Sequence, residues 1–143
     1  MYLSDNKISG ESAGTLAELF AHNHTLNVLV LDKNSIGNKG AVGIGEGLKL
    51  NQGLVNLYLM HNNISDEGVE GIAEGLKQNR TLKVIFFDGN ILSDNGAMAL
   101  LLSLKDNHVF KGIYYQNSED FEFAGGAEIE LLFDRKIKFK FAN

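Results

Sequence analysis

The sequence predicts an α/β solenoid, in which repeated strand–helix units stack side by side. Three observations predict this fold. The chain repeats itself every 28 residues, the first part of each unit has the apolar spacing of a strand, and the later part has the apolar spacing of a helix. The blocks 26–53, 54–81 and 82–109 align without gaps. One unit cannot bury its own apolar side, so we expect neighbouring units to share one continuous core.

The first residues of each unit predict a short strand. Apolar side chains stand at its first, fourth and sixth positions, while the alternate positions face the other way. The three regular units place there Leu26, Leu29 and Leu31, then Leu54, Leu57 and Leu59, then Leu82, Ile85 and Phe87.

The later residues of each unit predict a helix, because their apolar residues follow an i, i+3, i+7 pattern. The stripes are Ala41, Ile44 and Leu48, then Val69, Ile72 and Leu76, then Ala97, Leu100 and Leu104. A turn residue precedes each helix and suits an N-cap: Ser9, Gly37, Ser65 and Ser93. An asparagine follows each helix and predicts a left-handed C-terminal cap: Asn23, Asn51, Asn79 and Asn107.

A second asparagine recurs just after each predicted strand, as Asn6, Asn34, Asn62 and Asn90. There the chain leaves the sheet, and its backbone groups lose their strand partners. A buried Asn amide can both donate and accept hydrogen bonds, so we expect a structural ladder of these side chains along the solenoid.

Each unit begins L-x-x-L-x-L-x-x-N-x-I and continues with G-A-x-x-I/L-x-x-x-L-K-x-N. This pattern resembles a leucine-rich repeat, and the 28-residue length is similar to the ribonuclease-inhibitor type of that family. The resemblance covers nearly the whole chain, with five aligned copies. It implies a right-handed solenoid shaped as a horseshoe arc, with parallel strands on the concave face, helices on the convex face and about five repeats.

The ends of this single 1–143 domain depart from the regular pattern. Residues 1–25 form a partial N-terminal repeat, and residues 110–137 form a degenerate one. In the degenerate repeat Ser118 replaces the recurring Asn, Asp120 replaces an apolar residue and Ala124 replaces the Gly at the helix start. Residues 138–143 predict a C-terminal capping strand, whose alternating lysines protect a sheet edge or, in the alternative, bind an acidic partner.

Composition excludes several classes of protein. The net charge is −5, from 13 basic and 18 acidic residues, so we expect no nucleic-acid partner. No apolar run approaches the ~20 residues that a membrane span needs. The sequence has no Cys and no N-terminal signal-peptide pattern, which indicates a cytoplasmic, intracellular protein.

No set of residues predicts catalysis or metal binding. His22 and His24 lie near a helix end without a third ligand fixed by the repeat. His61 has Asp32 and Asp88 as diagonal neighbours in the predicted ladder, but no Ser or Cys lies beside it to complete a nucleophilic triad. The Gly-rich residues 43–47 fall inside a predicted helix, where no phosphate-binding loop can form. We therefore expect no enzyme activity, metal or cofactor.

The residues at the fifth strand position are the main candidates for binding. It holds Tyr2, Val30, Tyr58, Phe86 and Tyr114 in successive strands, which stack about 4.8 Å apart in a parallel ladder. Two interpretations stay open: the stripe contacts a protein partner, or it only stabilises the sheet through cross-strand pairs. The candidate binding residues on the concave face are Tyr58, Phe86, Tyr114, His61, Asp88, Lys83, Lys111 and Val30.

The sequence thus predicts a non-enzymatic protein–protein interaction module. One alternative is a self-assembling structural protein, a homo-oligomer formed through the segment from Met1 to Phe20. A second is a regulator similar to the Ran GTPase activators, which share this repeat type. This chain has two arginines, Arg80 and Arg135, and neither is placed as an obvious arginine finger for GTP hydrolysis, which ranks that alternative last.

Overall fold

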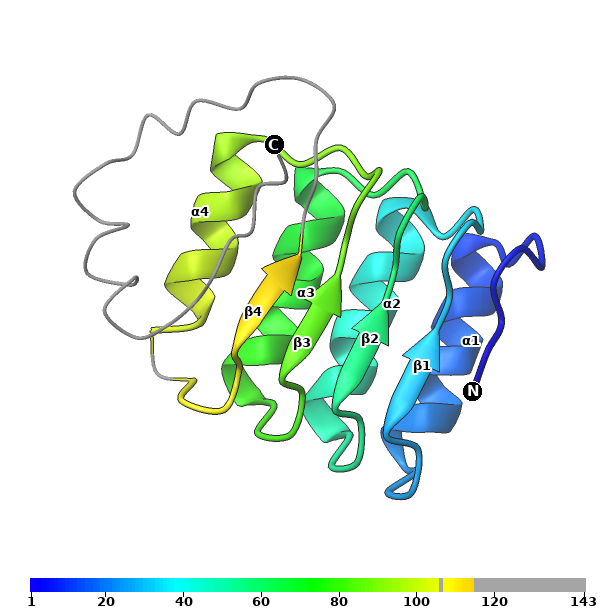
Figure 1. Ribbon diagram of the computed structural model, residues 1–143, viewed down its shortest axis with the longest axis horizontal. Coiled ribbons are helices and arrows are strands. Elements are labelled where there is room, and N and C mark those ends of the chain that lie inside the picture. The colour runs from blue at the N-terminus through cyan, green and yellow to red at the C-terminus, as the bar shows by residue number, and fades with distance from the viewer. Residues whose placement is uncertain (106, 115–143) are drawn as a thin grey trace.

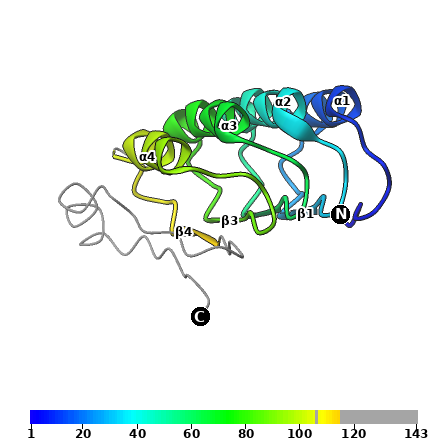
Figure 2. The same cartoon turned by 90° about the horizontal axis from the view of Figure 1, so that it is seen from above.

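The structure is a computed structural model that describes residues 1–105 and 107–114, in which helices and strands alternate along the chain. Figure 1 shows the strands side by side in front of the helices, and Figure 2 shows the two layers edge-on. The elements are α1 (Gly10–Ala21), β1 (Val28–Val30), α2 (Gly37–Leu50), β2 (Asn56–Tyr58), α3 (Asp66–Gln78), β3 (Val84–Phe86), α4 (Asp94–Ser103) and β4 (Gly112–Tyr114). The predicted repeat solenoid is confirmed.

The sheet is parallel, and its four strands lie in chain order, β1-β2-β3-β4. Each strand residue pairs with the residue 28 positions further on, as Val30 does with Tyr58 and Tyr58 with Phe86. Tyr2 adds a single parallel bridge to Val30 at the first edge. The predictions for residues 115–137 and 138–143, including Ser118, Asp120 and Ala124, fall outside the described residues.

The core lies between the sheet and the helices. The strand positions that the sequence assigns to it are buried, including Leu29, Leu57 and Ile85, except Leu26, which is partly buried. On the helix side Ile44 and Leu48 are fully buried. No helix in the described part of the chain has the length and apolar content to cross a membrane.

Close packing of α1, α2 and α3 depends on glycine. A Cβ atom on Gly45 of α2 would lie 2.0 Å from the carbonyl oxygen of Gly71 on α3. A Cβ atom on Gly75 of α3 would lie 2.3 Å from the carbonyl oxygen of Gly45, and one on Gly43 would lie 2.9 Å from the Cα of Gly14 on α1. These glycines weaken the helix propensity of α2 and α3, and in exchange they let neighbouring helix backbones touch.

The first asparagine set forms hydrogen bonds between neighbouring units. The Asn62 side chain is fully buried and donates from Nδ2 to the carbonyl oxygens of Leu31, Leu59 and Met60, at 2.9, 3.1 and 3.1 Å. The Oδ1 atom of Asn90 accepts hydrogen bonds from the backbone N–H groups of Asn62 and Ile64.

The same arrangement continues toward the first unit, where it ends. Asn34 donates from Nδ2 to the carbonyl oxygens of Leu3, Leu31 and Asp32. Asn6 is exposed, and its Nδ2 donates to the carbonyl oxygen of Ser4 in its own unit. The ladder therefore joins the strand ends of successive units from Asn34 to Asn90.

The second asparagine set corrects the prediction of left-handed caps. Asn51 and Asn79 have extended backbone, with φ −68° and −67°. Their side chains are buried and bridge units instead: Nδ2 of Asn79 donates to the carbonyl oxygens of Leu48 and Asn51. Oδ1 of Asn79 accepts from the backbone N–H of Leu82, two residues before β3. The carbonyl groups at the helix ends find their partners in the next unit, so no left-handed turn is needed.

The helix N-termini follow the prediction only in part. Ser9 and Ser93 accept hydrogen bonds from N–H groups in the first turns of α1 and α4. Ser65 makes no such bond, because its hydroxyl and backbone N–H both interact with the side chain of Asn38 on α2. Gly37 is the first residue of α2, with φ +56°, and is preceded by Ile36.

Candidate functional site

The outward side of the sheet, called the sheet face below, is formed by Val28, Val30, Asn56, Tyr58, Val84 and Phe86. Tyr58 and Phe86 stack on each other, with ring centroids 4.2 Å apart and planes at 9°. The in-register pairing of β2 with β3 places the two rings opposite each other. Both side chains are half-buried, so each keeps part of its ring open to solvent.

The stripe is less continuous than the sequence predicts. Val30 lies between Tyr2 and Tyr58 in the ladder and is only 8% exposed, so it offers little surface to a partner. Tyr2 is 81% exposed. The backbone of Tyr114 pairs with Phe86, and its side chain is not among those described. The observed aromatic centre is therefore the Tyr58–Phe86 pair.

A left-handed residue follows each of β1, β2 and β3, one place before the ladder asparagine. Lys33, His61 and Gly89 occupy this position, with φ of +55°, +54° and +70°. The His61 ring lies against the Gly89 backbone, since a Cβ on Gly89 would fall 2.1 Å from His61 Nδ1. The sequence-based prediction missed Gly89, although a glycine there contrasts with Asp5, Lys33 and His61 at the equivalent positions.

Charged groups gather where the strands end. The nearly buried Asp32 accepts a hydrogen bond at Oδ1 from the backbone N–H of Met60, at 2.8 Å. Burial raises the pKa of Asp32, and the nearby charge of Asp88 raises it further. The Met60 hydrogen bond and the charges of His61 and Lys33 lower the pKa, but the net shift is upward. His61 and Asp88 are joined through their backbones, because the N–H of His61 donates to the carbonyl oxygen of Asp88 at 2.8 Å. Among the described residues no ion pair joins His61 to either carboxylate.

Cationic groups gather at the opposite end of the strands. Lys83 directly precedes β3, Lys111 directly precedes β4, and both side chains are exposed. The backbone N–H of Lys111 donates to the carbonyl oxygen of Lys83 at 2.7 Å, so the two residues are neighbours in the ladder. The Tyr58–Phe86 pair thus lies between a basic border and a border that contains Asp32, His61 and Asp88.

No arrangement for metal binding is present in residues 1–105 and 107–114, where no three His, Cys, Asp or Glu side chains come together. His22 and His24 are both exposed at the end of α1. What the sheet face offers is a partly exposed aromatic pair, with charged side chains at both ends of the strands.

Residues 22–45 and 51–73 match the family model described as Leucine Rich repeat. These two segments are similar to leucine-rich repeats. They include the strands β1 and β2 and most of the helices α2 and α3. No curated protein sequence matches the chain.

A solved structure named "Leiomodin-1 Actin-Binding Site 2 (ABS2)" shares the fold. It superimposes with a TM-score of 0.81 and 24% sequence identity, and the match covers 95% of this chain and 79% of that one. The match extends the likeness from the two leucine-rich segments to almost the whole chain.

Proposed function

We propose that this chain is a leucine-rich repeat protein and a non-enzymatic interaction module that binds a protein partner through its sheet face. The observation that carries the proposal is the partly exposed Tyr58–Phe86 stack between two oppositely charged borders. Aromatic side chains surrounded by polar groups are typical of the energetic centres of protein interfaces.

The kind of protein that this chain resembles supports the proposal. The similar solved structure is named as an actin-binding site, which is a protein-binding role for that molecule. Actin is therefore a defined first probe for this chain. The charged borders indicate a partner that presents acidic groups toward Lys83 and Lys111, and basic groups toward Asp88.

Alanine substitution separates binding from sheet stabilisation. The Tyr58→Ala and Phe86→Ala variants should each weaken partner affinity by at least about tenfold, because each removes an aromatic anchor. The measurement is titration calorimetry with the partner recovered by pull-down, or with purified actin. Leu50→Ala, an exposed change on the helix layer, is the control.

Circular dichroism then checks that both variants remain folded. If the double variant is folded and binds with unchanged affinity, the stripe only stabilises the sheet and the proposal fails. An affinity that falls equally in Leu50→Ala would also contradict it, because that residue lies on the other layer.

We further propose the finer architecture that the ribonuclease-inhibitor-like resemblance implies. In it, about five repeats form a horseshoe arc inside the cell, with the sheet face concave and the repeat bounds at 26, 54, 82 and 110. Lys111 and Tyr114 would then extend the binding surface along the arc. An experimental structure that includes strands beyond β4 tests this arrangement.

Self-association is a second candidate, favoured by exposed apolar side chains in the first unit. Met1 is 50% exposed and Leu19 is 70% exposed, close in sequence to the exposed Tyr2. A homo-oligomer formed through the segment from Met1 to Phe20 would bury them. Light scattering at micromolar concentration should then report a multiple of 15.7 kDa, and a monomer mass would exclude this candidate.

A further inference from the structure

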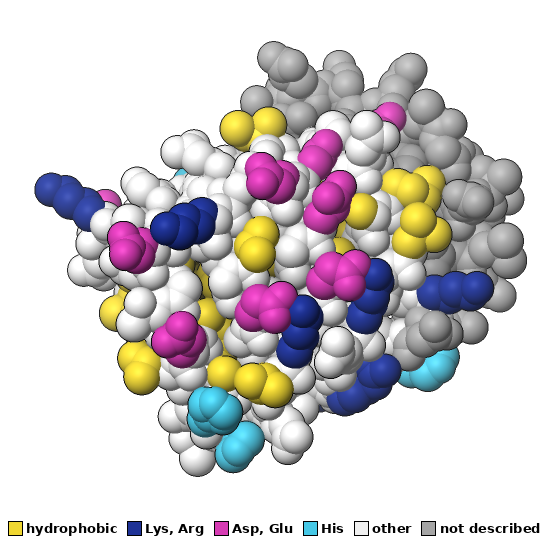
Figure 3. Space-filling view, turned by 180° about the vertical axis from the view of Figure 1, so that it is seen from behind, with side chains coloured by type: hydrophobic (Ala, Val, Ile, Leu, Met, Phe, Trp, Pro, Cys, Tyr) yellow, Lys and Arg dark blue, Asp and Glu magenta, His cyan; other side chains and the backbone are white. Residues whose placement is uncertain are grey.

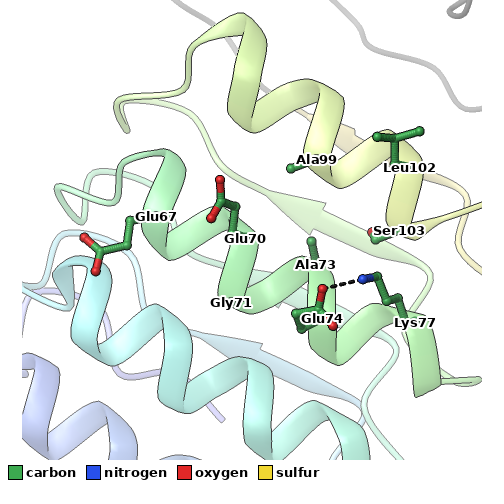
Figure 4. A pocket seen from close by; sticks show the side chains of 9 residues that line it. All are labelled: Glu67, Glu70, Gly71, Ala73, Glu74, Lys77, Ala99, Leu102 and Ser103. Atoms are coloured by element: carbon green, nitrogen blue, oxygen red, sulfur yellow. Dashed lines mark hydrogen bonds and ion pairs between the residues drawn. The ribbon is translucent and has the colours of Figure 1, made fainter.

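A groove lies between α3 and α4 on the helix layer. Figure 2 shows this layer on the side of the molecule opposite to the sheet. The volume of the groove is about 510 Å³. From α3 it is lined by Glu67, Glu70, Gly71, Ala73, Glu74 and Lys77, and from α4 by Ala99, Leu102 and Ser103 (Figure 4). We call this feature the α3–α4 groove.

The repeat pattern explains why a groove opens here. Between α2 and α3 the backbones touch, because Gly45 and Gly75 have no Cβ atoms to hold them apart. One unit later the position of Gly45 is taken by Ala73, and that of Gly75 by Ser103. Side chains at both positions keep α4 from packing against α3 as closely as α3 packs against α2.

The two helices remain tied at their N-terminal ends. Asp66 of α3 accepts a hydrogen bond at Oδ1 from the backbone N–H of Ser93, at 2.8 Å, and its other oxygen interacts with the Ser93 hydroxyl. The groove follows α3 from Glu67 to Lys77, a length of about 15 Å at 1.5 Å per residue. It is an elongated channel between two helices.

The walls of the groove are acidic. Glu74 pairs with Lys77, and Glu67 accepts a hydrogen bond from Asn38 at 3.1 Å. Glu70 is exposed and makes no hydrogen bond or ion pair with any described residue. Figure 3 shows the acidic side chains spread over this layer beside hydrophobic ones.

The floor is small and apolar. Gly71, Ala73 and Ala99 leave room for larger apolar side chains, and Leu102, which is 59% exposed, forms one edge. Three carboxylates against one lysine leave a net negative charge around this floor. An occupant that complements both features carries apolar side chains on one side and cationic side chains on the other.

We propose that the α3–α4 groove binds a basic amphipathic helix of a protein partner. Its apolar residues would fill the space over Ala73 and Ala99, and its lysine or arginine side chains would reach Glu67 and Glu70. A helix suits the channel because residues at i, i+3 and i+4 form one continuous apolar side. The proposal is independent of the sheet face and gives the protein a second binding surface on its other layer.

A model peptide tests the proposal directly. The probe is a fluorescent 14-residue peptide with leucine at helical i, i+3, i+4 spacing and lysine elsewhere, followed by anisotropy at low salt. Glu67→Gln and Glu70→Gln should each weaken binding about threefold to fivefold, and the double variant more than tenfold. Ala99→Phe, which fills the channel, should abolish binding. Glu46→Gln on α2 removes the same charge outside the groove and should leave the affinity unchanged.

Amide chemical shifts locate the bound peptide. On addition of peptide, shifts should change at residues 67–77 and 99–103 and stay constant in β1, β2 and β3. Equal weakening by Glu46→Gln and Glu70→Gln would show diffuse attraction to an acidic protein and overturn the proposal. Shifts centred on the sheet would overturn it, and so would equal binding of a peptide with glutamate in place of lysine. A dimer mass by light scattering that Ala99→Phe reduces to the monomer mass would show that a second copy of the chain occupies the groove, which would also overturn it.

Discussion

A single buried amide such as that of Asn62 holds three carbonyl oxygens from two units. Those carbonyls lie where the chain leaves the sheet, and each accepts a second hydrogen bond, Leu31 from Asn34, Leu59 from Asn90 and Met60 from the Lys33 N–H. The second set, represented by Asn79, does the same between helix ends and the next strand. At the residue scale, the solenoid is therefore held by asparagine side chains that connect one unit to the next.

Asn62→Ala should destabilise the protein by more than the loss of one hydrogen bond. It removes one of two hydrogen bonds from each of three carbonyl oxygens, and it takes away the Oδ1 acceptor of the buried Ile36 N–H. A buried polar group left without a partner costs about 1–3 kcal/mol. Urea unfolding followed by circular dichroism measures the change. Asn6→Ala is the matched control, because that side chain is exposed and bonds within its own unit, and its stability should change by less than about 0.5 kcal/mol. Similar losses at both sites would contradict the role assigned to the buried ladder.

Asp32 gives a pH-dependent prediction. Burial raises its pKa above the ordinary 3.8, so from 3.8 upward to the raised pKa the folded chain holds more protons than the unfolded chain. The contribution of Asp32 to the free energy of unfolding is therefore largest below pH 3.8 and decreases as the pH rises through the folded-state pKa.

Asp32→Asn removes this dependence, and its amide oxygen can still accept the Met60 N–H. The stability of the variant relative to the parent protein should therefore increase from about pH 3 to about pH 6. Urea unfolding at several pH values measures the difference between the two proteins. A constant difference, or one that decreases with pH, would show that burial does not raise this pKa.

At the scale of the elements, glycines set the distances between helices. Sequence patterns predict the helices and strands correctly, because apolar spacing reports which side of each element is buried. The same patterns assign a propensity cost to the helix glycines and miss their packing role, since that role depends on atoms of a neighbouring helix 26 or more residues away. The left-handed caps predicted at Asn51 and Asn79 failed for the same reason: their partners lie in the adjacent unit.

Two glycine substitutions with the same chemistry should have opposite effects. Gly45→Ala forces a Cβ against the Gly71 carbonyl, so it should destabilise the protein by about 1–3 kcal/mol. Gly14→Ala meets no atom within 4 Å, so it should stabilise α1 by about 1 kcal/mol through helix propensity. Thermal unfolding of both variants provides the comparison, and stabilisation by Gly45→Ala would refute the close contact.

At the scale of the whole molecule, the solenoid presents two layers of different chemistry. The sequence predicts the aromatic pair on the sheet face because its position in the repeat is regular. It does not reveal that Val30 is nearly buried or that Gly89 supports His61, because both depend on side-chain size in neighbouring strands. The α3–α4 groove opens because Ala73 and Ser103 take the repeat positions that Gly45 and Gly75 hold one unit earlier. The importance of this difference in the sequence is visible only once the helix contacts are known.

Hydrogen exchange should report this difference between units. α2 is packed between α1 and α3 at backbone contact distance, whereas α4 is separated from α3 by the groove. Backbone amides in the middle of α2 should therefore exchange at least about tenfold more slowly than those of α4, measured by NMR under native conditions. Equal protection of the two helices would show that the groove does not weaken the α3–α4 boundary.

The asparagine ladders also determine how this molecule can change in length. Ladder bonds between units reach residues 26 to 31 positions away. An insertion of a few residues shifts donors away from their acceptors, but a duplicated block such as 54–81 finds the same neighbours before and after it. A chain of this kind lengthens or shortens by whole units of 28 residues.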